Sequence, residues 1–400
     1  MTTKPLAMKI ISLVPYCILL TLSCGSQNNH LPRPAGKYLV GVGYLSLADS
    51  SRKELFDNNL KSYRTLTVKF WYPSDIKTSY EPYIENADYI ISNFQFSEDY
   101  RTLTTNSCRG VPVSKARKSY PVIIFSHGWG EHFSQNTILM EELASQGYIV
   151  FSMAHHYECK FSFYPDGRIV NLDVNSNRFR QIMQEQQNPD AIKIFQKMVL
   201  ATTDDDRKTI FIETNTFLPT FMTGSSTYWA EDIEFLINQL DDINRSNNLF
   251  KGRLDPTRIG VMGMSMGGIA TNEVCLMDRR IKAGISIDGA LYGSLVDTMM
   301  NLPFLFLNSK RYSGYGNLFV TKSNKDCYSV TVRNSDHYNF TDYALFPARN
   351  TNQIGTIDAK IPIDIMNSLI PAFFDKYLKD ELRINIKNIC KKYDVEFVTK

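Results

Sequence analysis

Short apolar runs recur along the chain at the spacing expected of buried strands. Residues 122–125 read Val-Ile-Ile-Phe, and the comparable runs are residues 148–153, 259–262, 283–287, 304–307 and 329–332. Such continuous runs are typical of strands that are buried on both faces of a parallel sheet. Helical or loop-length segments separate them, so the pattern predicts βαβ units. We therefore expect an α/β fold with a mostly parallel central sheet and helices on both faces.

Further regular elements precede this series, lie within it and follow it. Strands are predicted over residues 38–45 and 66–72, of which the second alternates, and residues 136–146 have a helical pattern. An amphipathic helix over residues 363–378 is expected to close the chain.

One interval, residues 158–228, breaks the rhythm. It has a polar helical middle between two aromatic clusters. A stretch of this length inside one domain predicts a cap-like insertion, and a peripheral subdomain is the alternative. The clusters favour either a surface that docks on lipid or ordinary core packing. Their apolar side chains are Phe161, Phe163, Phe217, Leu218 and Phe221.

The N-terminus has the pattern of an export signal. Residues 10–22 are almost wholly apolar and too few to span a bilayer, which needs about 20 residues. The run ends at Ser23-Cys24-Gly25, which resembles a bacterial lipoprotein cleavage box, with an ordinary cleaved signal as the alternative. We expect a signal over residues 1–23, lipidation at Cys24, a tether over 24–36 and one domain over 37–400. The protein would be anchored in the bacterial cell envelope, or secreted if it is not lipidated.

Composition and charge exclude several classes of protein. The 400 residues are 43% hydrophobic, enough for a large core, and 44 basic residues against 41 acidic ones leave a formal charge of +3. A nearly balanced charge without a basic stretch argues against a nucleic-acid partner. The seven cysteines form no CxxC pair and no regular spacing, so neither a disulfide scaffold nor a zinc site is indicated.

The candidate nucleophile is Ser265. It stands in Gly263-Met264-Ser265-Met266-Gly267, which directly follows an apolar strand and precedes a helical stretch. This context is what a nucleophile elbow requires, because a strained turn lifts the serine hydroxyl clear of the sheet. The glycines remove side chains that would collide where the chain doubles back.

A serine hydroxyl needs a general base, and the base needs an acid that orients it. Behind a G-x-S-x-G elbow the order along the chain is Ser, then Asp or Glu, then His. His337 is the only histidine after Ser265. Asp288 ends the apolar run 283–287, at the carboxyl end of a predicted parallel strand, where active sites form. The competing carboxylates are Asp297, Asp326 and Asp336.

The oxyanion of an acyl-transfer intermediate needs two backbone N–H donors. We expect one from Met266, the residue after the nucleophile. The second is expected from Trp129, in the loop after the strand 122–125, with Gly128 as the alternative. His127 is interpreted as a residue that supports this loop.

From residue 120 to the last helix the chain resembles the type II platelet-activating factor acetylhydrolases. The likeness rests on Phe125-Ser126-His127-Gly128, Gly263 to Gly268, Asp288, and His337-Tyr338-Asn339-Phe340-Thr341-Asp342. The resemblance implies an α/β-hydrolase fold, calcium-independent phospholipase activity, and the roles already given to Ser265, Asp288, His337, Trp129 and Met266. Met264 departs from the family, which usually has His before the nucleophile.

These observations together predict a serine-dependent hydrolase of carboxylic esters that needs no metal and no organic cofactor. The expected substrate is the short sn-2 acyl group of phospholipids similar to platelet-activating factor, bound at a membrane surface. The alternative is a broad short-chain carboxylesterase that acts on acetylated polysaccharides or polyester-type substrates. A non-catalytic surface-binding lipoprotein is the hypothesis from another class.

Overall fold

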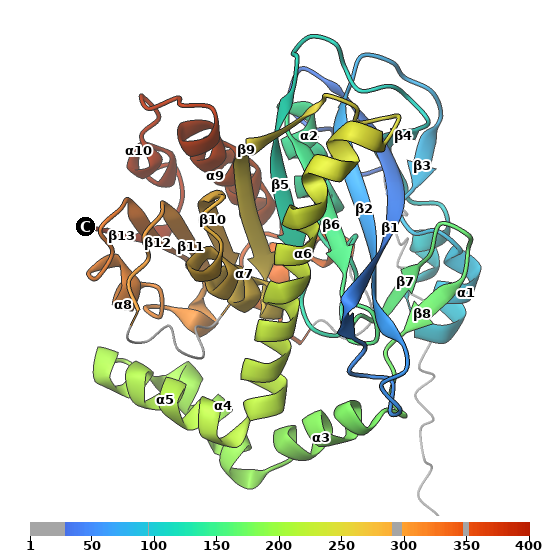
Figure 1. Cartoon of the computed structure of the whole chain (residues 1–400). Coiled ribbons are helices and arrows are strands. Elements are labelled where there is room, and N and C mark those ends of the chain that lie inside the picture. The colour runs from blue at the N-terminus through green and yellow to red at the C-terminus, as the bar shows by residue number, and fades with distance from the viewer. Residues whose placement is uncertain (1–28, 95, 290–297, 347–351) are drawn as a thin grey trace, which may run out of the picture.

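The fold is centred on one sheet, seen in a computed structural model that describes residues 29–94, 96–289, 298–346 and 352–400. The strand order is β13-β12-β11-β10-β9-β5-β6-β2-β1-β4-β3. The six strands from β12 to β6 pair in parallel, whereas β2 and β13 pair antiparallel at either side of them. This arrangement confirms the predicted α/β fold with a mostly parallel central sheet (Figure 1).

The apolar runs found in the sequence form the centre of this sheet. The strands in chain order are β1 (Leu39–Lys53), β2 (Tyr63–Ser74), β3 (Tyr80–Pro82), β4 (Thr104–Arg109), β5 (Tyr120–Ser126), β6 (Ile149–Ala154), β9 (Leu254–Met264), β10 (Ile281–Ile287), β11 (Phe304–Ser309), β12 (Cys327–Val332) and β13 (Val395–Thr399). Every residue of β5, β6, β11 and β12 is buried, which explains why these strands show no alternation of apolar and polar residues.

Both faces of the sheet are covered by helices. In β5, Val122 and Ile124 belong to one core with the apolar side of α6 (Ser225–Ser246). Ile123 belongs to a second core with α2 (Thr137–Ser145) and α9 (Lys360–Leu378). In Figure 1, α6 crosses in front of the sheet and α2 and α9 lie behind it. The strand positions therefore alternate between two buried layers.

Four further helices of the described chain pack around the sheet. They are α1 (Ala87–Phe94), α7 (Met266–Met277), α8 (Asn317–Val320) and α10 (Ile386–Cys390). The expectation that the helix over 363–378 closes the chain is wrong, because α10 and β13 follow it. β13 pairs with β12 and forms one edge of the sheet. Its residues Val-Glu-Phe-Val-Thr form neither a continuous apolar run nor a strict alternation, so their signal is weaker than that of the buried runs.

The interval over residues 158–228 is ordered and largely helical. It begins with a two-stranded sheet and continues with three helices, which lie together below the central sheet in Figure 1. Its elements are β7 (Phe161–Phe163), β8 (Ile169–Asn171), α3 (Asn177–Gln186), α4 (Pro189–Leu200), α5 (Asp204–Phe217) and a π-helical turn (Pro219–Gly224). The acidic residues 204–206 form the first turn of α5, where Asp206 and Thr203 make a capping box.

Near the N-terminus, part of the expected tether lies against the domain. The Leu31 side chain is buried, and the Gly36 N–H donates to the Ser145 hydroxyl. Residues 1–28 are outside the described part, and so are the expected signal and Cys24. In the ranges that the structure describes, no helix has the length and hydropathy needed to cross a membrane.

The cysteines of the described chain are buried and unbridged. They are Cys108, Cys159, Cys275, Cys327 and Cys390. Burial raises the pKa of the Cys159 and Cys327 thiols to about 12, so these groups are protonated at neutral pH.

A buried carboxyl group joins helix α2 to strand β4. Glu141 of α2 accepts hydrogen bonds from the backbone N–H of Asn106, at 2.7 Å, and from the Ser107 hydroxyl. Burial raises the pKa of Glu141 to about 7, although these hydrogen bonds act in the opposite direction. The folded protein therefore holds this proton more tightly than the unfolded chain does.

This raised pKa predicts a pH-dependent stability. Between the unfolded pKa near 4.5 and the folded value near 7, the folded state binds more protons, so the free energy of unfolding falls as pH rises through this window. The loss attributable to Glu141 is on the order of 3 kcal/mol. We expect Glu141→Gln to remove that contribution in urea unfolding at pH 5, 6, 7 and 8. Glu142→Gln, one position further along α2, is the matched control. If the free energy of unfolding changed with pH by the same amount in wild type and in Glu141→Gln, the raised pKa of Glu141 would be contradicted.

Candidate active site

The turn that carries Ser265 is strained. Strand β9 ends at Met264 and helix α7 begins at Met266, and between them Ser265 has φ 56° and ψ −120°. A residue with a side chain adopts such a conformation only where the surroundings impose it. A methyl group on Gly267 would lie 2.1 Å from the Ser126 carbonyl oxygen, so only glycine allows this close approach. The geometry is that of the predicted nucleophile elbow.

Ser265 lies between the end of β10 and the loop that follows β5. Its N–H donates to the carbonyl of Ile287, at 2.9 Å. A methyl group on Gly128 would lie 3.4 Å from the Ser265 Cβ. The serine is half-buried and so keeps contact with solvent. The turn thus brings the candidate nucleophile beside both the candidate acid and the candidate oxyanion loop.

Asp288 and His337 come together across the carboxyl ends of neighbouring strands. Asp288 directly follows β10, and His337 begins a short 3₁₀ helix after β12. The Asp288 Oδ2 lies 2.6 Å from the His337 Nδ1, and the Oδ1 accepts from the Ser309 N–H at 2.6 Å. Asp288 is fully buried, whereas the imidazole of His337 is 13% exposed. A carboxylate can only accept here, so Nδ1 donates and Nε2 is left free to take a proton.

The carboxylate next to His337 in sequence has a different partner. Asp336 receives two hydrogen bonds from the Arg311 guanidinium, at 2.7 and 3.0 Å, and one from the His337 N–H. Burial would raise the pKa of Asp336, but the bonds from Arg311 and from the His337 N–H lower it. Asp326 precedes β12 and so lies at the opposite end of that strand from His337. Asp297 is outside the described residues. This geometry favours Asp288 as the orienting acid.

The loop after β5 contains both candidates for the second oxyanion donor, the backbone N–H groups of Gly128 and Trp129. The N–H of Gly128 donates to the Gln135 side chain at 3.1 Å, so it is already used. Among the residues that the structure describes, we find no acceptor for the backbone N–H of Trp129 or of Met266. Two unpaired N–H groups beside the nucleophile are what an oxyanion hole requires. The arrangement favours Trp129 over the alternative, Gly128.

The insertion contacts the site through the side chain of Trp129. Its indole ring stacks on Phe179 of α3 at 6.3 Å and meets Phe221 of the π-helical turn at 5.2 Å. Tyr315, after β11, donates its hydroxyl to the carbonyl of Met198 in α4 at 2.9 Å. The insertion therefore packs on two loops of the site. This contact favours the interpretation as a cap and not the alternative of a peripheral subdomain.

The aromatic clusters of the insertion do not form an exposed surface. Phe161 and Phe163 are buried in one core, together with Phe96. Leu218 and Phe221 are buried in the other core, against which Phe217 packs partly buried. Of the two interpretations left open for these side chains, core packing agrees with their burial and an exposed docking surface does not.

Sequence reasoning missed two side chains that hold the site in place. Gln135 fixes the Gly128 N–H, and Arg311 anchors the loop of His337 through Asp336. Both contacts depend on the packing of loops, so the sequence holds no local signal for them. Across the described ranges, no three His, Cys, Asp or Glu side chains are placed to hold a metal ion.

The sheet and the site define the class: the protein is an ester-hydrolysing enzyme of the α/β-hydrolase kind. The family model of platelet-activating factor acetylhydrolase, isoform II, matches residues 23–388, and the chain belongs to this family. Platelet-activating factor acetylhydrolase of Bos taurus is 23% identical over 372 residues, which cover 87% of this chain and 77% of the relative. The Gallus gallus enzyme is 23% identical over 89% of this chain and 86% of its own length.

A solved structure supports the same fold. It is a ferulic acid esterase from Streptomyces cinnamoneus, with a TM-score of 0.67 and 23% identity. The match covers 92% of this chain and 99% of that structure's chain.

The contact between Asp288 and His337 leads to a direct test. Asp288→Asn keeps the shape of the side chain but favours the wrong imidazole tautomer, so kcat should fall roughly 10⁴-fold. Asp336→Asn removes the neighbouring carboxylate, which faces Arg311, and should lower kcat far less. The measurement is kcat for a chromogenic acetyl ester. Equal losses in the two variants would mean that Asp288 is not the orienting acid.

Proposed function

We propose that this enzyme hydrolyses short-chain carboxylic esters, with short sn-2 acyl groups of phospholipids as its substrate. The observation that carries the proposal is the Asp288–His337 hydrogen bond of 2.6 Å beside the strained turn of Ser265. Membership of the platelet-activating factor acetylhydrolase family supports the choice of phospholipid.

In this mechanism the hydroxyl of Ser265 attacks the ester carbonyl carbon while the Nε2 of His337 takes the hydroxyl proton. Asp288 holds the imidazole in the required tautomer and stabilises the imidazolium. The oxyanion accepts hydrogen bonds from the N–H groups of Trp129 and Met266. The C–O bond then breaks, and the leaving lysophospholipid alcohol takes the proton from His337. Water attacks the acyl-enzyme through the same base and releases a short carboxylic acid and free Ser265.

We also propose that the enzyme works at a membrane surface, anchored through a lipid on Cys24. Beyond the expected anchor, exposed apolar side chains on α4 and α5 support this placement. Its side chains are Ile192, Val199, Leu200 and Ile212, of which Leu200 is 76% exposed. Exposed apolar patches of this kind mark membrane or protein contacts. Helices α3 to α5 pack on the loops of the site. These exposed side chains therefore lie on the insertion, beside which we expect a lipid to reach Ser265.

The substrate class is tested by the rate of hydrolysis against sn-2 acyl length. Phosphatidylcholines from acetyl upward are offered to the full chain, with a water-soluble acetyl ester beside them. We expect kcat/KM to be highest for the shortest acyl groups and to exceed that for the simple ester. Ser265→Ala should lower kcat roughly 10⁶-fold.

The control outcomes separate the alternatives. Equal or better turnover of the simple ester would move the function to a broad carboxylesterase. Undiminished turnover by Ser265→Ala would overturn the mechanism itself. A fluorophosphonate probe that fails to label the wild-type chain would favour a non-catalytic binding protein.

The membrane placement makes a separate prediction. Leu200→Glu puts a charge among these exposed apolar side chains. Because burial of one leucine in lipid would be lost, the rate on phospholipid vesicles should fall roughly tenfold or more. The rate on the soluble ester should stay unchanged. Leu382→Glu is the matched control, because Leu382 is similarly exposed, at 71%, in the loop after α9. Equal behaviour of the two variants on vesicles would contradict a lipid contact at α4.

A further inference from the structure

The peptide unit between Gly128 and Trp129 carries two groups that cannot be oriented separately. The Trp129 N–H lies at one side of this unit and the Gly128 carbonyl at the other. Because a trans peptide is planar, the two groups point in opposite directions. Whatever fixes the Gly128 carbonyl therefore also fixes the direction of the Trp129 N–H.

The Gly128 carbonyl is held by the imidazole of His127. The His127 Nδ1 lies 2.7 Å from this oxygen, and the Glu131 N–H donates to the same oxygen at 3.0 Å. On the other side of the ring, the backbone N–H of His155 donates to the His127 Nε2 at 3.2 Å. A backbone N–H can only donate, so Nε2 carries no proton and Nδ1 carries it. The contact with His155 thus sets the tautomer that lets His127 bind the carbonyl.

The neutral state of His127 follows from its surroundings. The ring is fully buried and lies 5.1 Å from the rings of both His155 and Trp229. Burial, together with the proximity of His155, lowers the pKa of His127 well below its usual range. A neutral imidazole has one donor and one acceptor, which is what the two contacts of this ring use.

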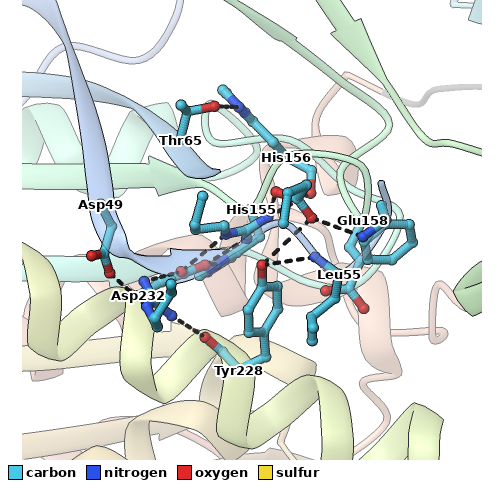
Figure 2. A network of polar contacts seen from close by, with 12 residues as sticks. Asp49, Leu55, Thr65, His155, His156, Glu158, Tyr228 and Asp232 are labelled. Atoms are coloured by element: carbon cyan, nitrogen blue, oxygen red, sulfur yellow. Dashed lines mark hydrogen bonds and ion pairs between the residues drawn. The ribbon is translucent and has the colours of Figure 1, made fainter. Parts of the chain in front are cut away.

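His155 in turn is fixed by a buried chain of polar groups (Figure 2). Its Nδ1 lies 2.8 Å from the Asp232 Oδ2, and the Ser126 hydroxyl donates to its Nε2 at 2.8 Å. Its ring stacks on Trp229 at 3.9 Å. Asp232 forms an ion pair with the buried Arg64 at 2.6 Å. Burial lowers the pKa of His155 to about 4, although Asp232 acts in the opposite direction, so His155 is neutral at pH 7.

These residues form a second Ser–His–Asp arrangement that is not placed for chemistry on an ester. Ser126, His155 and Asp232 are all 0% exposed, and Ser126 is the last residue of β5 beneath the elbow. With no route for a substrate, the hydroxyl serves as a donor to the ring. The arrangement holds His155, and through its backbone the ring of His127.

We propose that His127 is a positioning residue, whose Nδ1–H tautomer aims the Trp129 N–H at the oxyanion. The chain Arg64–Asp232–His155 keeps that tautomer in place. This inference rests on the proposed function, because it takes Trp129 as an oxyanion donor. It predicts that the exact position of one N–H group in residue 127 controls transition-state stabilisation and leaves substrate binding unchanged.

Three substitutions separate this role from packing. The amide of His127→Asn places an N–H near the position of Nδ1 and can still donate to the Gly128 carbonyl. His127→Gln places its amide near Nε2 instead, and His127→Leu has no polar group. Removing an oxyanion donor costs about 10²–10³ in kcat, and we expect a misdirected donor to cost roughly 10- to 100-fold. His127→Leu and His127→Gln should show this loss with KM unchanged, whereas the kcat of His127→Asn should stay within about threefold of wild type, because its donor is kept.

A measurement on the unaltered chain tests the same inference without a substitution. Nitrogen-15 NMR of the histidine rings should show His127 as the Nδ1–H tautomer at pH 7, assigned by the signal that is lost in His127→Asn. An Nε2–H tautomer would overturn the proposal, whether or not the variants fold. Equal kcat losses in the Asn and Leu variants, or losses confined to KM, would also overturn it.

Two further controls separate this inference from the proposed function. His30→Asn changes a histidine that is bonded to Thr104 and Asn106, and it should keep wild-type kcat. Activity that survives Ser265→Ala would mean that the proposed function itself fails. An inactive Ser265→Ala beside fully active His127 variants would leave that function standing and remove only the inference about His127.

Discussion

The site depends on how closely the elbow approaches the end of strand β5. Gly267 lies against the carbonyl of Ser126, where any side chain would collide, and its N–H donates to the carbonyl of His127 at 3.1 Å. This contact holds the strained turn of Ser265 against the loop that contains Trp129. One backbone contact between the start of α7 and the end of β5 therefore sets the distance between the nucleophile and the N–H groups expected to stabilise the oxyanion.

The parts of the molecule around this contact have different roles. The central parallel strands provide rigid ends on which the reactive groups stand, and the insertion packs on the loops that connect them. Between these layers lie two polar pairs, the half-buried Asp336–Arg311 behind the base and the fully buried Asp232–His155 behind the oxyanion loop. Groups such as Asp232 and His155 are stable in a low-dielectric interior only when each is paired, so they tolerate little displacement. The reactive residues that these pairs support are therefore held in fixed positions.

The sequence predicted the elements whose signals are local. Continuous apolar runs marked the central strands, and chain order pointed to Ser265, Asp288 and His337 because a G-x-S-x-G turn restricts where its partners follow. The edge strand β13 was not predicted, because its five residues are half-buried or exposed and show little pattern. The burial of Phe161 and Phe221 was undetermined, since an apolar side chain reads the same in a core and on a docking surface. Gln135 and Arg311 depend on loops meeting in space, which residue patterns do not encode.

The buried thiols have a consequence for the conditions in which this fold can exist. No cross-link joins any two cysteines of the described ranges, and the thiols of Cys159 and Cys327 are held in the protonated form, which is a poor nucleophile. The described domain therefore has the same covalent structure in reducing and in oxidising surroundings. Its folding needs no oxidant and no disulfide isomerase, and mild reductants should leave its packing intact. The described fold therefore does not depend on the redox state of its surroundings.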